Sequence, residues 1–172
     1  MKALKLSALA LLLAGSSAAW ADPINFTGTV STVTCNASVG QNGATLSSPT
    51  VSLGTVAPSA TGSAVNFAIM PDASQAGCQS LTTTNTATTT WSGNFGATGL
   101  TTAGSAADDA MIEIKTVNAK TTAVSAVTSS SLAKDFDGAV FKADGAKYTA
   151  TLKGGTKTGA VSAAATYTMS YQ

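Results

Sequence analysis

The chain has 172 residues, of which only 10% are charged, and its formal net charge is +1. This length allows one domain with a substantial core but hardly two, and so weak a charge provides no basic patch for nucleic acid or an anionic membrane. The sequence contains no histidine and no arginine, and the lack of histidine excludes a Ser-His-Asp catalytic triad.

The first residues are typical of a secretory signal peptide. Lys2 and Lys5 form a short positive region, residues 6–13 an apolar run, and residues 19–21 a small-residue cleavage site. The apolar run is too short to cross a bilayer, which takes about 20 residues. We therefore expect an exported chain that begins at Asp22, in which seven lysines are balanced by eight acidic residues.

The two ends of the mature chain read as β-strands. Residues 24–30 and 165–171 each alternate larger or apolar side chains with small polar ones, the period of a strand with one buried face. Neither segment has adjoining chain that could cover it, which is typical of a subunit built to join others. Two ordinary strands paired within one closed sandwich explain the same alternation, and a β-bulge would equally explain Gly28.

The composition between these ends favours strands and tight turns over helices, because threonine, serine, alanine and glycine dominate. Breakers rich in glycine and aspartate separate short apolar segments, which predicts an all-β sandwich. The threonine-rich run 82–90 leads into Trp91, and we expect an edge strand there. The expected strands comprise residues 24–39, 51–56, 64–70, 88–92, 111–117, 139–141, 148–152 and 163–171.

Cys35 and Cys78 are the only cysteines, and an even pair in an exported chain predicts a disulfide. On the chain-entropy model, closing a loop of this length restricts the unfolded chain by roughly 4 kcal/mol. A metal or redox role is disfavoured because the CxxC spacing and histidine partners are missing. We expect a staple between two strands, formed in an oxidising compartment.

Several short motifs could carry chemistry in another context. Residues 131–134 (S-x-x-K) and 157–159 (K-T-G) match two of the three motifs of serine β-lactamases, but no S-D-N lies between them, so we interpret both as chance. Asp108-Asp109 and residues 135–138 offer carboxylates, yet a calcium loop needs more oxygen ligands in series, and we expect turns. Trp91 is expected in the core or a groove rather than as a sugar-stacking platform.

Taken together, the motifs resemble a known family. The pattern Phe26-x-Gly28-x-Val30, the cysteine pair, Gly159 near the end and the penultimate Tyr171 closely resemble the pilins of the chaperone-usher pathway. Residues 51–54 (V-x-L-G), 91–93 (W-S-G) and the ending 165–172 are most similar to the major shaft subunits of type 3 fimbriae and their relatives in Gram-negative bacteria. The resemblance covers the whole mature chain, and its specificity lies in the combination of motifs.

The resemblance implies an incomplete immunoglobulin-like β-sandwich that lacks its final strand and is completed by a donor strand from another subunit. It divides the chain into a signal peptide (residues 1–21), a donor-strand extension (22–34) and a pilin domain (35–172). At Gly28 the acceptor groove would be too tight for a side chain. The donor strand would present Ile24, Phe26, Gly28, Val30 and Thr32, and the acceptor groove, which is also the chaperone-binding surface, would comprise Gly159, Ala165, Tyr167, Met169 and Tyr171.

The implied function is structural rather than enzymatic, without catalytic residues, metal or cofactor. The chain would be a polymerising subunit of a surface fimbria that supports adhesion and biofilm formation. Its partners would be identical or related pilin subunits, a periplasmic chaperone and an outer-membrane usher; nucleic acid is not among them, and binding of a host glycan along the shaft stays open. The chain would pass through the periplasm to an extracellular fimbria. Two alternatives also stay open, a minor adaptor subunit of the same pathway and a monomeric secreted carbohydrate-binding β-sandwich.

Overall fold

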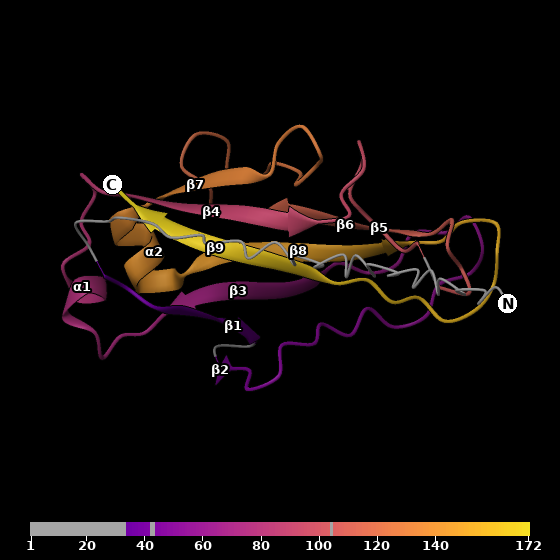
Figure 1. The fold of residues 1–172 in the computed structure, drawn as a ribbon, viewed down its shortest axis with the longest axis horizontal. Helices are drawn as coiled ribbons and strands as arrows, with labels where there is room; N and C mark the ends of the chain where they lie inside the picture. The colour runs from indigo at the N-terminus through magenta and orange to yellow at the C-terminus, as the bar shows by residue number, and fades with distance from the viewer. Residues whose placement is uncertain (1–33, 42–43, 104) are drawn as a thin grey trace, which may run out of the picture.

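The computed structural model describes residues 34–41, 44–103 and 105–172, which form two β-sheets and two short helices (Figure 1). Within these ranges no helix is long and apolar enough to cross a membrane. The helices are α1 (Ala76–Gln79) and α2 (Gly138–Asp144). The strands are β1 (Ala37–Gln41), β2 (Ala44–Thr45), β3 (Val65–Pro71), β4 (Thr86–Gly93), β5 (Leu100–Thr101), β6 (Met111–Thr116), β7 (Ala133–Asp137), β8 (Ala146–Lys153) and β9 (Ala165–Tyr171).

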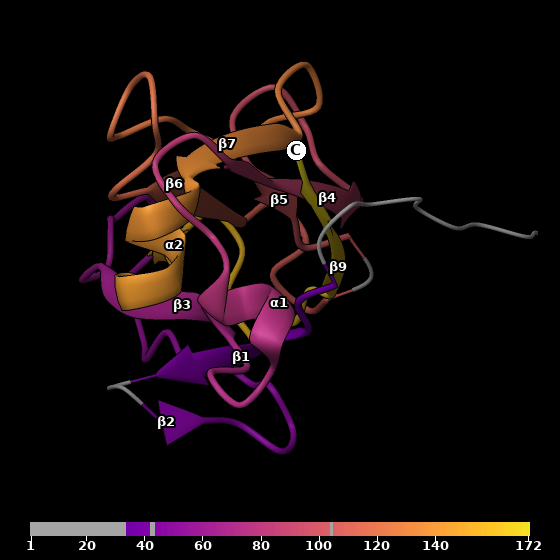
Figure 2. The same ribbon diagram turned by 90° about the vertical axis from the view of Figure 1, so that its left-hand side faces the viewer.

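The two sheets differ in size. The larger has the strand order β2-β1-β3-β8-β6-β5 and the smaller β7-β4-β9, and every pairing is antiparallel. Figure 2 views them from the end that carries both helices, with β9 on one flank and β1 and β2 below. The predicted all-β sandwich is confirmed.

The period of two residues explains where the main strands form. In β8 the side chains of Ala146, Tyr148, Ala150 and Leu152 are buried, and the residues between them are only partly covered. β4 and β6 repeat this alternation. Such strands bury one face against the opposite sheet and leave the other for threonine and lysine, which suits β-branched residues. The strands predicted near β3, β4, β6, β8 and β9 are therefore confirmed.

Tyr148 joins the two sheets at the centre of the core. Its ring stacks on Phe67 with centroids 5.5 Å apart and meets Trp91 edge-on at 5.3 Å. Its hydroxyl shares a hydrogen bond with the hydroxyl of Thr89 and accepts one from Trp91 Nε1 at 3.3 Å. Trp91 is only 6% exposed, which confirms the predicted core position and argues against a sugar-stacking role. Phe136 packs on the same tyrosine at 5.7 Å.

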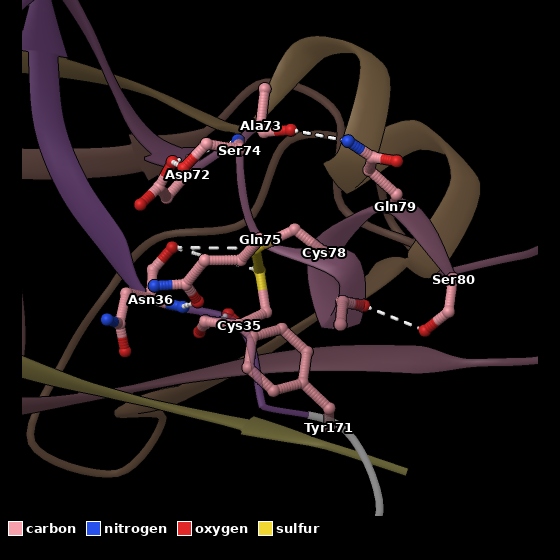
Figure 3. The surroundings of a disulfide bond; sticks show 11 residues. Cys35, Asn36, Asp72, Ala73, Ser74, Gln75, Cys78, Gln79, Ser80 and Tyr171 are labelled. Carbon is pink, nitrogen blue, oxygen red and sulfur yellow. Dashed lines mark hydrogen bonds between the residues drawn. A yellow bond between two sulfur atoms is a disulfide. The ribbon is translucent and has the colours of Figure 1, made fainter.

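The predicted disulfide between Cys35 and Cys78 forms (Figure 3), but it does not join two strands as expected, because Cys78 lies in α1 and Cys35 precedes β1. It ties the chain that precedes β1 to α1, which follows β3. The approach is close, since a Cβ on Gly77 would lie 1.8 Å from the carbonyl oxygen of Thr34. The backbone N–H of Asn36 also donates to Gln75 Oε1 at 2.7 Å. This end of the sandwich is therefore held by a covalent bond and by close packing of backbone.

The prediction of a strand at residues 139–141 and a turn at 135–138 is wrong. Residues up to Asp137 form β7, and α2 begins directly after it, because the Asp137 carboxylate accepts hydrogen bonds from the N–H groups of Ala139 (2.9 Å) and Val140 (3.2 Å). Gly145, with φ of 73°, ends the helix. The sequence therefore contained an N-cap and a C-terminal glycine that the strand interpretation overlooked.

Two further predictions are corrected. Residues 51–56 are not in a strand in the described structure, although Val51, Leu53 and Val56 pack partly buried against the core. β4 is the central strand of its sheet rather than an edge, because β7 pairs with its other side. The short strand β5 lies in the predicted turn region 93–105, and β2 lies between the predicted turn 40–43 and the predicted strand 51–56. Of the first predicted strand (24–39), the part up to residue 33 lies outside the described residues.

Candidate functional site

The outer edge of β9 borders no other strand in the described part of the chain. β9 pairs with β4 in a register that runs from Ala87 opposite Tyr171 to Gly93 opposite Ala165, and it ends the strand order of the smaller sheet. The edge of a sheet is a template on which a further strand can add by backbone hydrogen bonds. β9 is therefore the natural place for an added strand.

The side chains of β9 alternate between the core and solvent. Thr166 and Thr168 are exposed, whereas Ala165, Tyr167 and Met169 are half-buried and pack against the core. Tyr171, at the end of the strand, is buried. Three apolar side chains on the inner face thus retain exposed surface that an additional strand could cover.

A cavity of about 660 Å³ opens beside the chain that leads into β9. Its first wall is residues 50–58 and its second wall is residues 157–163. Ile112 of β6 and Leu152 of β8, both nearly fully buried, contribute to the lining between them. Lys157 is the one charged residue among the described residues of the lining. Apolar side chains could enter this groove without desolvating a carboxylate.

The first wall is not tied into either sheet. Among the described residues, 47–56 form no backbone–backbone hydrogen bond, whereas Leu46 bonds to Val39 and Ala60 to Ala57 on either side of this stretch. Backbone polar groups that are to be buried need partners. The backbone of the first wall thus lacks the hydrogen bonds of a sheet, and the second wall leads directly into β9. A strand of another chain could supply the missing backbone partners.

Two tyrosines fix β9 to the start of the described domain. Tyr167 Oη donates to the carbonyl oxygen of Ala37 at 3.1 Å, and Tyr171 Oη donates to that of Cys35 at 2.9 Å. Burial raises the pKa of Tyr171 to about 12 and raises that of Tyr167 as well. Both hydroxyls therefore remain neutral donors at physiological pH, and they hold β9 close to the chain that leads into β1.

The structure brings only part of the predicted acceptor set to the cavity. Gly159 lines it, and its φ of 139° together with a Cβ position 2.5 Å from Ala106 Cβ explains why glycine is needed there. The four other acceptor residues follow along β9, beyond the cavity lining. The predicted donor residues Ile24, Phe26, Gly28, Val30 and Thr32 lie outside the described residues. The roles assigned to both sets stay predictions.

Sequence reasoning missed much of the groove. Within the first wall, residues 51–56 were expected only as one more strand, and no local signal pointed to Ala107 and Ala110, which also line the cavity. These small residues come from a turn-rich stretch between β5 and β6. They reach the groove only because the fold brings that stretch beside residues 157–163.

The two β-lactamase-like motifs take part in different local structures. Lys134 is 5% exposed and donates hydrogen bonds to Ser131 Oγ at 2.7 Å and Ser125 Oγ at 2.8 Å, and burial lowers its pKa. Lys157, of the K-T-G motif, lies in the groove and pairs with Asp108 at 2.7 Å. Lys134 thus anchors the segment that leads into β7, while the other motif belongs to the groove wall.

Comparisons with known proteins give one extensive sequence match. No protein-family model matches the chain. The chain is 39% identical over 161 residues to the F107 fimbrial protein of Escherichia coli, which covers 94% of this chain and 92% of that protein. A crystal structure of the P pilus rod subunit PapA has 19% identity and a TM-score of 0.49, covering 88% of this chain and 100% of that one. The first match spans nearly the whole of both proteins.

Proposed function

The chain belongs to the family of the fimbrial proteins, and from this premise we propose that its sandwich is completed by a strand donated by another subunit. The protein is a structural subunit of a surface fimbria, not an enzyme, and its partners in the fimbria are related subunits. The joint between subunits would be a strand of one chain that enters the groove of the next and is held by backbone hydrogen bonds.

The observation that carries this proposal is the groove itself. Its lining mixes apolar side chains with uncharged polar ones and Lys157, it adjoins the chain that enters β9, and its first wall has no backbone ladder within the described residues. A closed sandwich would pair or cover such an edge. A strand added here would gain backbone partners and would bury the half-exposed side chains of Tyr167 and Met169 at the same time.

The extension at residues 22–34 has the pattern expected of the donor. Ile24, Phe26 and Val30 alternate with small or polar residues, so one face of this strand would be apolar. A strand of ten residues spans roughly 33 Å, longer than the roughly 23 Å covered by the seven residues of β9. The donor would therefore be long enough to follow β9 and to continue into the cavity beside residues 157–163.

The same reasoning suggests how the subunit would travel. An uncovered groove with an open strand edge is an aggregation hazard, so a periplasmic chaperone would occupy it after export, with residues 1–21 removed. An outer-membrane usher would then exchange the chaperone strand for the extension of the next subunit. The domain would begin at Cys35, and the finished fimbria would serve adhesion and biofilm formation. A host glycan would be a ligand of the assembled shaft.

The test uses the mature chain from Asp22, refolded from denaturant with and without a fluorescent peptide of residues 22–34. We expect the wild-type chain to form a ladder of multimers and to take up the peptide. A chain carrying Gly28→Tyr should remain monomeric, because its own strand no longer fits, yet it should still bind the wild-type peptide. A peptide with the same substitution is the matched control and should not bind.

A different outcome would overturn the proposal. A wild-type chain that stays monomeric, and whose unfolding midpoint in urea is the same with and without excess peptide, would have a closed sandwich. Glycan binding by that isolated monomer would then favour the carbohydrate-binding alternative.

A further inference from the structure

The second wall of the groove is held by a segment far from it in sequence. Residues 105–109, between β5 and β6, run alongside residues 156–162 in the opposite direction, with Ser105 beside Ser162 and Asp109 beside Thr156. We call residues 105–109 the brace. Its contacts explain why this wall stays in place although it is neither helix nor strand.

Asp109 makes the densest contacts of the brace. Its carboxylate accepts hydrogen bonds from the N–H of Thr156 (2.6 Å), from the hydroxyl of Thr156 (2.6 Å) and from the N–H of Lys157 (3.2 Å). These bonds hold the pKa of Asp109 below its ordinary value, with the Thr156 hydroxyl the main cause. The fit is close, since a Cβ on Gly155 would lie 2.2 Å from Asp109 Oδ1. One side chain thus fixes the start of the wall.

Ser105 fixes the other end of the same wall. Its hydroxyl donates to the carbonyl oxygen of Ser162 at 2.8 Å and accepts from the N–H of Ser162 at 2.9 Å. Between the two ends, the N–H of Ala107 donates to the carbonyl oxygen of Ala160 at 3.4 Å. Side-chain oxygens therefore satisfy backbone groups that a regular sheet would pair by its ladder.

The brace is itself anchored in the core. The buried hydroxyl of Thr102 lies within hydrogen-bond distance of the carbonyl oxygens of Ala107 (3.0 Å) and Ala110 (2.7 Å). Ala107 and Ala110 are nearly fully buried, and both line the groove. Ala107 of the brace and the adjoining Ala110 thus present small apolar side chains to the cavity, while Ser105 and Asp109 hold the wall.

We propose that the brace keeps the groove open in the subunit before a strand enters, and that Asp109 is the positioning residue on which the rate of strand uptake depends. The wall carries Ala160, Val161 and Ala163, and Ile112 and Leu152 lie across the cavity. Without the brace the wall would fall inward and bury this apolar surface, because water contact with it is unfavourable. The groove would then have to reopen for every strand that enters, which lowers the fraction of competent subunits.

This proposal rests on the proposed function, and its test separates the two. The mature chain and its variants are mixed with an excess of the fluorescent 22–34 peptide, and the uptake rate is measured by fluorescence anisotropy. Asp109→Ala should slow uptake at least about fivefold, through the smaller competent fraction. The matched control is Asp144→Asn, which removes an exposed ion pair with Lys147 outside the groove lining and should leave the rate within about twofold of wild type.

A second measurement excludes a merely structural role. Hydrogen exchange of the Thr156 and Ser162 amides reports whether the wall has been released, and the urea midpoint of the peptide-bound protein reports stability. Slow uptake with faster exchange and a bound-state midpoint close to wild type would support the brace. Wild-type uptake despite faster exchange would overturn it. If Asp109→Ala does not fold, Ser105→Ala decides in the same way, and lack of uptake by the wild-type chain would instead contradict the proposed function.

Discussion

The core around Tyr148 and the groove beside β9 differ in how fully the side chains that line them are packed. In the core, residues of both sheets meet: Phe67, Trp91 and Phe136 surround the tyrosine ring, and its hydroxyl has partners on the facing sheet. In the groove, apolar side chains of two walls face a cavity of about 660 Å³. The core is completed by residues of the described chain, and we propose that a strand of another subunit completes the groove. Binding of a donor strand should therefore change how much groove residues contribute to the free energy of unfolding. The contribution of the core residues should stay the same.

The largest effect should come from the finished region. Phe136 is fully buried, so Phe136→Ala should lower the free energy of unfolding by about 4 kcal/mol through lost burial and a cavity. Because the proposed donor strand would lie beside β9 and not against Phe136, the loss should be the same with and without the 22–34 peptide. Urea unfolding of the mature chain in both states measures it, and a loss that the peptide largely restores would contradict the comparison.

The groove should behave in the opposite way. Leu53 of the first wall is only partly buried, so Leu53→Ala should cost about 1 kcal/mol in the uncompleted subunit. Once a strand covers the wall, the same substitution should cost about 3 kcal/mol, as for a buried leucine. Peptide titration with urea unfolding gives both values. Equal costs in the two states would mean that the added strand does not cover Leu53.

Alkaline pH should act on the finished region through Tyr148. Burial raises the pKa of Tyr148 to about 12, whereas an unfolded tyrosine ionises near pH 10. The stability that this neutral tyrosine provides is therefore complete below about pH 10 and falls as the pH rises towards 12, by about 2 kcal/mol. Urea unfolding between pH 9 and pH 12 (approximate limits) measures the loss.

The matched variant for this prediction is Tyr148→Phe, which should lose about 2 kcal/mol less than wild type over the same interval. Tyr171, whose pKa is also raised to about 12, is present in both proteins. Lys134 works in the opposite direction, because its lowered pKa makes the folded protein gain stability as the pH rises towards 10.5. Its effect cancels in the comparison, and identical pH profiles would show that Tyr148 ionises freely in the fold.

The smallest effect should come from charge at the surface. Asp144 and Lys147 form an ion pair at 2.8 Å in which both side chains are largely exposed. Asp144→Asn should change the free energy of unfolding by less than about 0.5 kcal/mol, and less still in high salt. The peptide-bound and free forms should respond alike. A larger change in one form would reveal an effect of α2 on the groove.

Sequence reasoning predicted those elements whose signal is local. The alternation of residues 148–152 and 165–171 identifies β8 and β9 because each buries one face. It fails for α2, where the cap Asp137 and the terminator Gly145 outweigh the β-branched and aromatic residues between them. It also fails for residues 51–56, which alternate like a strand but pair with no described strand, since strand formation needs a neighbour as well as a pattern.

The groove was predictable only in part. Gly159 and the inner face of β9 follow from the family resemblance; Gly159 lines the cavity, the β9 residues lie beyond its lining, and their role as acceptors stays a prediction. The brace could not be predicted from the sequence pattern, because Ser105 and Asp109 form hydrogen bonds with residues about 50 positions later in the chain. In addition, two consecutive aspartates are common in turns and give no specific signal. Contacts between residues so far apart in the sequence form only once the strands have taken their places in the fold.

The disulfide also bears on how a filament of such subunits would carry tension. A force applied to the chain at residue 34 acts directly on Cys35. The disulfide transmits it to Cys78 and α1, so the hydrogen bonds between β1 and β3 do not carry it alone. The hydroxyl of Tyr171 bonds to the carbonyl of the same cysteine, so β9 shares the load. Tension applied at residue 34 would therefore load the disulfide and β9 before it reached the ladder between β1 and β3.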